Sequence, residues 1–269
     1  MTPDEKLSRL KNILGRCDSA LVAFSGGVDS TFLLRVARDV LGAQKVIALT
    51  ATSPTYPRYE FEQSRRLAAE LGVRQIVVES NELEIEGFAQ NPPDRCYHCK
   101  HELFSLCRDK ARELGFQEIF DGSNRDDLED HRPGRRAGAE LKVRSPLVEA
   151  ELTKADIRLL SRELGLETWD KQPFACLSSR FPYGMEITAE RLAQVDRCET
   201  HLRDCGFRTY RVRYHGDTAR IELAAEELPR LLDAPLRENI VAEFKAAGFT
   251  YVALDLQGYR SGSMNEVLT

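Results

Sequence analysis

The stretch "AFSGGVDST", residues 23–31, decides the fold, because two glycines and a carboxylate join an apolar run to a helical pattern. The apolar run at 20–24 predicts a buried strand over 21–24, and the apolar spacing of 31–41 predicts a helix. At the turn between this strand and this helix, Gly26 and Gly27 have no side chains that would cover the backbone. A strand that leads directly into a helix is the unit from which parallel sheets are built.

The same alternation continues through the first half of the chain. Further strands are predicted at residues 46–50, 75–79 and 118–121, and further helices at 59–71 and 103–114. The helical patterns at 31–41, 59–71 and 103–114 are each followed by a glycine, which is typical of a helix C-terminus. We therefore predict an α/β fold, a parallel sheet with helices on both faces, whose ligands lie beyond the carboxyl ends of the strands.

The second half changes character. Residues 122–146, rich in Gly, Pro and charge, predict a long loop, a helix with a good N-cap follows at 153–164, and 167–184 has no regular pattern. From Glu186 the order becomes α-β-β-α-β, with a hairpin turn at 215–217 and helices at 188–202, 226–232 and 236–247. We expect two domains: 1–184, which carries the glycine turn, and a small α+β domain at 185–269.

Composition narrows the class of protein. No run approaches the roughly 18 apolar residues of a membrane span, and the charged N-terminus lacks a signal-peptide core. The net charge of −5 argues against a nucleic-acid partner. Seven cysteines without a secretory signal argue against a disulfide framework. We expect a cytoplasmic protein with no membrane or nucleic-acid partner, whose thiols pack, ligate metal or react.

The glycine turn predicts a phosphate site. The amides of Gly26 and Gly27 and the start of the next helix attract an anion, and Ser25 and Ser30 add hydroxyl donors. Asp29 is an acid within this anion site, which is understandable if it binds Mg²⁺ travelling with the phosphates. The lysine of the Walker motif is absent. The plain alternative is an ordinary strand–turn–helix bend.

Three cysteines stand apart from the four that look like packing residues (Cys17, Cys107, Cys198 and Cys205). "RCYHCK" places Cys96 and Cys99 just before a helix, and Cys176 lies in the irregular stretch "PFACLSSRFPYG". Three thiolates suit a 4Fe-4S cluster with one open iron, or a reactive thiol with two helpers, better than structural zinc with its four ligands. A zinc knuckle or plain packing remains an alternative for Cys96 and Cys99.

"SGGVDS" resembles the PP-loop of the ATP pyrophosphatases, which adenylylate a carbonyl or carboxylate and release pyrophosphate. Over almost its whole length the chain is similar to the LarE family of ATP-dependent sulfur transferases, through "RCYHCK", "DGSNRDD", "RSPLVEAELTKADIR", "FACLSSRFPYG" and "ALDLQGYRSGSMNE". The resemblance implies that ATP and Mg²⁺ activate a carboxylate of pyridinium-3,5-biscarboxylic acid mononucleotide. A thiol at Cys176 then attacks, and the carboxylate becomes a thiocarboxylate for the nickel-pincer cofactor of lactate racemase.

Two sulfur sources fit that resemblance. Cys96, Cys99 and Cys176 match a variant of the family in which a 4Fe-4S cluster carries an extra sulfide on its open iron. Otherwise Cys176 is sacrificial, its Cβ–S bond breaks and dehydroalanine remains. The family also implies a homo-oligomer, a hexamer, and a hand-off of the product to a nickel-inserting partner.

The resemblance also suggests contacts to the substrates. The mononucleotide phosphate needs cations, and the expected ones are Arg180, Arg211, Arg213 and Arg260, with Glu199 orienting one of them. Arg211 and Arg213 share a strand face, which could equally be a solvated outer face. On the ATP side we expect Gly122 and Asn124 near the nucleotide and Lys100 on the departing pyrophosphate.

Other functions remain open on the sequence alone. A tRNA thiolase shares the PP-loop and the three-cysteine pattern, although the acidic charge disfavours it. An ammonia-using synthetase would not need the thiols. A nucleotide-binding sensor or zinc-stabilised scaffold would bind without turnover.

Overall fold

The computed structural model describes residues 1–128, 134–172, 175–260 and 262–268. The chain separates into two compact units. The first comprises Met1–Glu82 and Asp94–Phe174, and the second comprises Leu83–Pro93 and Ala175–Thr269. The division at 184/185 expected from the sequence stays a prediction.

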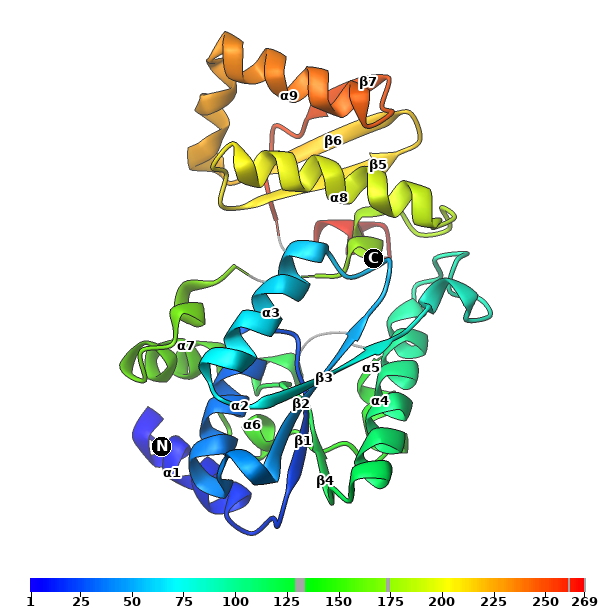
Figure 1. Ribbon diagram of the computed structural model, residues 1–269. Coiled ribbons are helices and arrows are strands. Elements are labelled where there is room, and N and C mark those ends of the chain that lie inside the picture. The colour runs from blue at the N-terminus through cyan, green and yellow to red at the C-terminus, as the bar shows by residue number, and fades with distance from the viewer. Residues whose placement is uncertain (129–133, 173–174, 261, 269) are drawn as a thin grey trace. The chain divides into compact units, whose positions relative to one another are not determined.

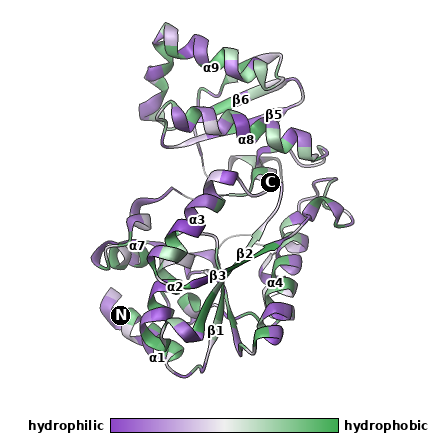
Figure 2. Ribbon diagram, in the orientation of Figure 1, coloured by the Kyte–Doolittle hydropathy of each residue, from purple (hydrophilic) through white to green (hydrophobic). Residues whose placement is uncertain are grey.

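A parallel sheet of four strands forms the centre of the first unit among the described residues (Figure 1). The spatial order is β3-β2-β1-β4, built from β1 (Ala20–Ala23), β2 (Val46–Thr52), β3 (Arg74–Glu79) and β4 (Glu118–Phe120). The central pair, β1 and β2, is almost entirely buried, as its apolar composition requires, and Figure 2 shows both strands as hydrophobic.

Helices cover both faces of this sheet, which confirms the predicted fold class. One face packs against α1 (Pro3–Leu14), α2 (Val28–Leu41), α3 (Arg58–Glu70), α6 (Pro146–Glu149) and α7 (Lys154–Glu163). The other face packs against α4 (Arg95–Leu114), which in turn carries α5 (Gly134–Glu140). Short 3-10 turns lie at Ala43–Lys45, Glu82–Glu84, Asp126–Leu128 and Glu167–Asp170.

Two expectations about this unit were wrong. Cys96 and Cys99 were placed in a loop before a helix, but α4 already begins at Arg95 and includes both. Its first two turns carry few apolar residues, so hydrophobic periodicity starts only at Leu103. The long loop expected at 122–146 contains α5, whose buried face is made of small residues such as Ala137 and Gly138 packed near Phe104. Such a helix gives little periodic signal.

The second unit has the predicted α-β-β-α-β order. It contains α8 (Ala189–Asp204), β5 (Tyr210–His215), β6 (Thr218–Leu223), α9 (Ala234–Ala246) and β7 (Tyr251–Leu254). The hairpin β5–β6 is antiparallel, and β7 adds to β6 in parallel. The segment expected to be helical at 226–232 is a 3-10 turn, Ala225–Leu232, because Pro229 interrupts it. Further 3-10 turns are Leu177–Arg180 and Ser263–Leu268.

The segment Leu83–Pro93 is tied to the second unit by polar contacts. Asn91 is buried, and its side-chain amide donates to the carbonyl oxygens of Phe181 and Pro182. The amide of Ile187 donates to Ala89 at 2.8 Å. Nowhere in the described ranges does a helix combine the length and the apolar character needed to cross a membrane.

Candidate functional site

The glycine turn lies between the carboxyl end of β1 and the start of α2, and its role as a phosphate loop stays a prediction. Gly27 is the N-cap of α2, and no side chain of the described residues caps it. The first amides of α2 are therefore open to an anion. The hydroxyl groups of Ser25 and Ser30 lie 3.2 Å apart, and Ser30 also donates to the Gly27 carbonyl at 3.3 Å. These contacts hold the loop in one shape.

Position 26 requires glycine for two reasons, the backbone conformation and the lack of space for a side chain. Its φ is +66°, and a Cβ at this position would lie 3.0 Å from the Cα of Ser64 on α3. The Nζ of Lys171 donates to the Gly26 carbonyl at 3.1 Å and to Glu60 at 2.6 Å. The hydroxyl of Tyr56 donates to the carbonyl of Ser25 at 2.8 Å. The loop is thus fixed from the side of α3.

Asp29, the expected Mg²⁺ ligand, lies in the first turn of α2 and faces two partners. The ammonium group of Lys154 forms an ion pair with its Oδ2, and the amide Nδ2 of Asn124 donates to its Oδ1 at 3.4 Å. Lys154 therefore occupies the position of a cation at this carboxylate. A carboxylate beside an open anion site is the donor chemistry that Mg²⁺ accompanying phosphates requires, so the residues fit a magnesium site.

The loop after β4 lies against the same turn. A Cβ on Gly122 would lie 3.0 Å from the backbone nitrogen of Ser30, so only glycine allows this approach. Asn124 is buried, and its Oδ1 accepts from the amide of Asp126. The structure thus brings Gly122 and Asn124 together with Ser30 and Asp29.

Lys100, expected near pyrophosphate, lies on α4. Its Nζ is 5.3 Å from the centre of the Phe104 ring. Its stem packs closely on Gly134, where a Cβ would lie 2.7 Å from the Lys100 Cγ. A role on pyrophosphate stays a prediction.

The thiols of Cys96 and Cys99 lie one turn apart at the start of α4. Cys96 is exposed and Cys99 is half-buried. The Sγ of Cys99 donates to the carboxylate of Glu82 at 3.8 Å, and Glu82 itself is buried. Within the described ranges, no three His, Cys, Asp or Glu side chains form a group that could hold a metal ion. The third expected ligand, Cys176, belongs to the second unit.

Cys176 precedes the 3-10 turn Leu177–Arg180 and is half-buried. Its carbonyl and that of Ala175 accept from the guanidinium of Arg180 at 3.0 and 2.7 Å. Arg180 is itself buried and forms a two-pronged ion pair with Glu199, at 2.9 and 2.8 Å. Burial alone would raise the pKa of Glu199, but Arg180 holds that pKa below its usual value. Arg180 and Glu199 thus fix the backbone at Cys176.

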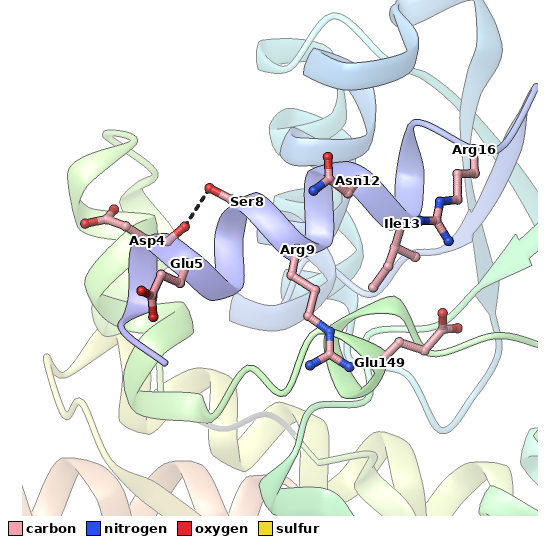
Figure 3. Close-up of a pocket in the computed structure, with 8 residues that line it drawn as sticks. All are labelled: Asp4, Glu5, Ser8, Arg9, Asn12, Ile13, Arg16 and Glu149. Carbon is pink, nitrogen blue, oxygen red and sulfur yellow. Dashed lines mark hydrogen bonds between the residues drawn. The ribbon is translucent and has the colours of Figure 1, made fainter.

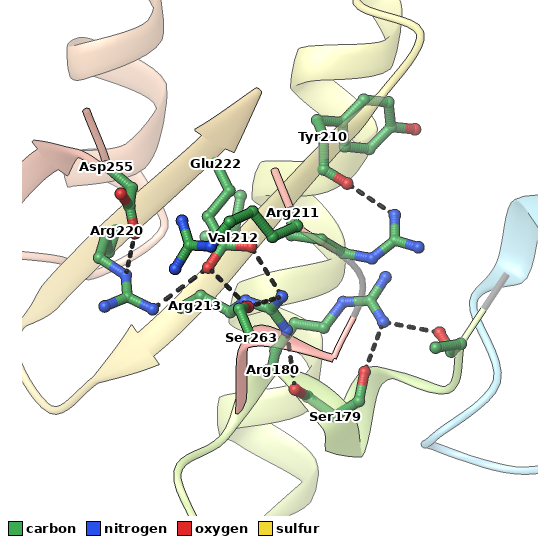
Figure 4. Close-up of polar contacts among 12 residues, drawn as sticks. Ser179, Arg180, Tyr210, Arg211, Val212, Arg213, Arg220, Glu222, Asp255 and Ser263 are labelled. Atoms are coloured by element: carbon green, nitrogen blue, oxygen red, sulfur yellow. Dashed lines mark hydrogen bonds and ion pairs between the residues drawn. The ribbon is translucent and has the colours of Figure 1, made fainter. Parts of the chain in front are cut away.

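Figure 4 shows the arginines that surround this turn. Arg213 is buried, pairs with Glu222 at 2.7 Å, and also donates to Ser263 and to the carbonyl of Ser179. Arg211 lies 5.2 Å from the Tyr259 ring centre, and burial, followed by the charge of Arg180, lowers its pKa. Burial is the larger of these two causes, and both disfavour the charged guanidinium, so an anion beside Arg211 would favour its charged form.

Arg260, the fourth expected arginine, contacts its own segment. It donates to the carbonyl of Gly258 at 3.4 Å and pairs with Glu266 at 3.2 Å. Its assignment to the substrate phosphate stays a prediction.

A groove elsewhere in the first unit contains none of the expected residues. It has a volume of about 670 Å³ and runs along α1 (Figure 3), lined by Asp4, Glu5, Ser8, Arg9, Asn12, Ile13, Arg16 and Glu149. Arg9 is engaged with Glu151, and the lining is shallow and charged. We assign no function to it.

Sequence reasoning missed Lys154, Lys171 and Glu222. Lys154 directly follows a recognisable N-cap, Thr153, which was the one local signal available. Lys171 becomes meaningful only through its contact with Gly26, which is distant in the sequence. Glu222 becomes meaningful through the pairing of β5 with β6, which brings it to Arg213.

Comparison with known proteins agrees with this geometry. A model of the NAD synthase family matches residues 9–106. An uncharacterized protein of Synechocystis is 44% identical over 266 residues, 99% of each chain. The pyridinium-3,5-bisthiocarboxylic acid mononucleotide synthase of Lactiplantibacillus plantarum is 42% identical over 248 residues, 92% of this chain and 89% of the relative. A tRNA-specific 2-thiouridylase of Lawsonia intracellularis is 35% identical over only 38% of this chain. At this identity and coverage, the chain belongs to the LarE family of PP-loop proteins, that of the Lactiplantibacillus synthase.

Proposed function

We propose that this chain is an ATP-dependent sulfur transferase that converts the carboxylates of pyridinium-3,5-biscarboxylic acid mononucleotide into thiocarboxylates. The observation that carries the proposal is the phosphate loop with Asp29, in a chain that matches such a synthase over 92% of its length. The product named for that relative is a bisthiocarboxylate.

The first step is activation of the carboxylate. A carboxylate oxygen of the substrate attacks the α-phosphorus of ATP, pyrophosphate leaves, and an acyl adenylate forms. The open amides of α2 bind the phosphates, and Asp29 holds the accompanying Mg²⁺. Gly122 and Asn124 contact the nucleotide, and Lys100 binds the departing pyrophosphate.

The second step is sulfur transfer, in which AMP leaves the acyl carbon. We propose that Cys96, Cys99 and Cys176 hold a 4Fe-4S cluster, and that the cluster supplies a sulfide equivalent when bound. Two of these thiols lie one turn apart on α4, a spacing that suits a shared centre. Arg180 and Glu199 position the backbone at Cys176.

The second candidate mechanism uses Cys176 as a sacrificial sulfur donor. It is favoured by the thiol of Cys176, which is only half-buried, so that an acyl carbon can reach it without a cluster. The Cys176 thiolate attacks the acyl carbon, AMP leaves and a thioester forms. Removal of the Cα proton of Cys176 then breaks its Cβ–S bond. The thiocarboxylate leaves with the sulfur, and dehydroalanine remains.

The mononucleotide phosphate binds among the arginines of the second unit. Arg211 and Arg213 are the proposed direct contacts, because both lie on β5 and a dianion beside them would favour the charged form of the largely buried Arg211. Arg260 is a further candidate, and Arg180 acts through Glu199 and Cys176.

We further propose that the chain forms a homo-oligomer, a hexamer by family resemblance. It works where thiols stay reduced, in the cytoplasm, and passes its product to a nickel-inserting partner in maturation of lactate racemase. The seven cysteines, all present as thiols, are compatible with a reducing compartment.

The test is anaerobic turnover with ATP, Mg²⁺ and the pyridinium mononucleotide, with pyrophosphate release, iron content and intact protein mass measured together. A cluster mechanism predicts bound iron, lost in Cys96→Ala and Cys99→Ala, and an unchanged protein mass. A sacrificial mechanism predicts that the protein loses the mass of hydrogen sulfide at Cys176. If neither pyrophosphate nor thiocarboxylate appears, while bulk tRNA becomes thiolated, the thiolase reading holds instead.

A further inference from the structure

Lys154 is a cation that pairs with Asp29 across the glycine turn. Its ammonium group pairs with Asp29 Oδ2, and the two side chains are 33% and 20% exposed. The pair is therefore partly shielded, yet it remains within reach of an incoming ion.

The position of Lys154 is built by its surroundings. Lys154 is the first residue of α7, after the capping box of Thr153 and Asp156. Its backbone amide donates to the carboxylate of Asp126 at 2.9 Å. The amide of Arg125 donates to Leu152 at 2.8 Å, so the loop after β4 and the start of α7 are joined. This connection presents the lysine to Asp29.

We propose that Lys154 is a placeholder for Mg²⁺ at Asp29 and exchanges that carboxylate for a phosphate of ATP when the nucleotide arrives. This rests on the proposed use of ATP and Mg²⁺ at the phosphate loop. Mg²⁺ binds carboxylate oxygens at about 2.0–2.1 Å, and it competes with the ammonium for Asp29 because two cations at one carboxylate repel each other. The displaced ammonium is a mobile point charge with three donors, and the triphosphate is the new anion beside it.

The exchange couples the two ligands. Without ATP, Mg²⁺ must displace Lys154 and leave its ammonium with no new anion, so binding is weak. With ATP present, the displaced ammonium gains a phosphate, so each ligand strengthens the binding of the other. Lys154 is thus a positioning residue in the resting state and a phosphate contact in the loaded state.

The experiment measures Mn²⁺, as a spectroscopic substitute for Mg²⁺, by electron paramagnetic resonance with and without a non-hydrolysable ATP analogue. Lys154→Met should bind Mn²⁺ up to about fivefold more tightly without nucleotide, as expected on loss of a competing ion pair. The same variant should lose most of the mutual enhancement between Mn²⁺ and the analogue. Lys154→Arg keeps the positive charge and should keep weak nucleotide-free binding.

Lys110→Met is the matched control, because Lys110 is also about a third exposed and paired with a carboxylate, Glu113, but on the surface of α4. It should leave Mn²⁺ binding unchanged. Asp29→Asn should abolish the measured binding. Melting temperatures show whether each variant is folded, and Lys154→Gln replaces Lys154→Met if the latter is not.

Unchanged or weaker nucleotide-free Mn²⁺ binding in folded Lys154→Met or Lys154→Gln would overturn the proposal, as would Mn²⁺ binding that survives in Asp29→Asn. The measurement needs no pyridinium substrate. A protein that shows the predicted exchange but makes no thiocarboxylate would refute the proposed function and leave this inference standing.

Discussion

Arg211 is the residue whose environment most directly suggests a bound anion. Burial and the positive charge of Arg180 lower the pKa of Arg211, and the charge of Arg213 adds to this effect. Arg180 forms an ion pair with the buried Glu199, and Arg213 forms one with the buried Glu222. Arg211 lies within electrostatic reach of both Arg180 and Arg213, and we propose that the substrate phosphate binds at this group of arginines.

Replacing Arg211 by Gln should raise the KM for the pyridinium mononucleotide about ten- to a hundredfold, because a charge-assisted hydrogen bond contributes roughly 1.5–3 kcal/mol. Binding of ATP, measured by calorimetry, should stay the same. Arg197→Gln is the control, since Arg197 pairs with Glu243 on the exposed side of α8. An unchanged KM in Arg211→Gln would show that the substrate phosphate does not bind at these arginines.

The thiols divide into two groups by environment. Burial raises the pKa of Cys107 and of Cys198 to about 12, so both remain protonated at neutral pH. Cys96 is exposed. Iodoacetamide at pH 8 should label Cys96 of iron-free protein and spare Cys107 and Cys198 until the protein unfolds, as read by peptide mass spectrometry. Equal labelling of Cys107 and Cys96 in folded protein would contradict these environments.

At the scale of elements, the approach of the β4 loop to α2 depends on a missing side chain. Gly122→Ala places a Cβ about 3.0 Å from the Ser30 nitrogen and must push the loop away. Such overpacking typically costs about 1–3 kcal/mol. We expect weaker ATP binding and a lower melting temperature.

Gly138→Ala is the matched control for that substitution. Gly138 lies within α5, and its added Cβ would make an ordinary 3.5 Å contact with Phe104. It should be neutral or slightly stabilising, because alanine favours helix. If Gly122→Ala binds ATP as the parent does, the close packing has no role in the nucleotide site.

Elements were predictable where their signal was local. The strands β1, β2 and β4 and the N-cap at Thr153 follow from short apolar runs and one hydroxyl, and all were found within a few residues. The start of α4 was missed because its first turns are polar, and α5 was missed because its buried face is small. Both helices are defined by their packing on each other, which a periodic pattern does not record.

At the scale of the whole molecule, the second unit depends on a buried ion pair. Because the pKa of Glu199 is lowered in the folded state, the pair stabilises fully above the unfolded pKa, and this contribution is lost as the pH falls through the folded value. Removing one partner of a buried pair costs roughly 3–5 kcal/mol. Glu199→Gln should therefore destabilise the second unit strongly at pH 7, and the difference from the parent should shrink in acid.

Urea unfolding at pH 7, 4 and 3 checks this dependence, because the contribution is lost only below the ordinary pKa of a glutamate, about 4.3. Circular dichroism follows both units, whereas the fluorescence of the single tryptophan, Trp169, reports on the first. The circular dichroism transition should move to lower urea at pH 7, with a smaller change in the fluorescence transition. A difference between variant and parent that grows in acid would contradict the lowered pKa.

The residues of the candidate site could be predicted where they belong to short sequence motifs. The phosphate loop, Asp29 and the three cysteines are visible in the sequence, because glycine pairs and thiol spacings are local. Lys154, Lys171 and Glu222 were not visible, since each acts on a partner that only the folded chain brings near. An isolated lysine or glutamate carries no signal of such a partner.

The central claim is that sulfur reaches an AMP-activated carboxylate through Cys176. Its most direct test is mass spectrometry of the pyridinium mononucleotide after anaerobic reaction with ATP and Mg²⁺, for the parent and for Cys176→Ser. The account predicts exchange of oxygen for sulfur with the parent, and pyrophosphate without any sulfur-containing product with Cys176→Ser. Thiocarboxylate formed by Cys176→Ser at the parental yield would contradict it.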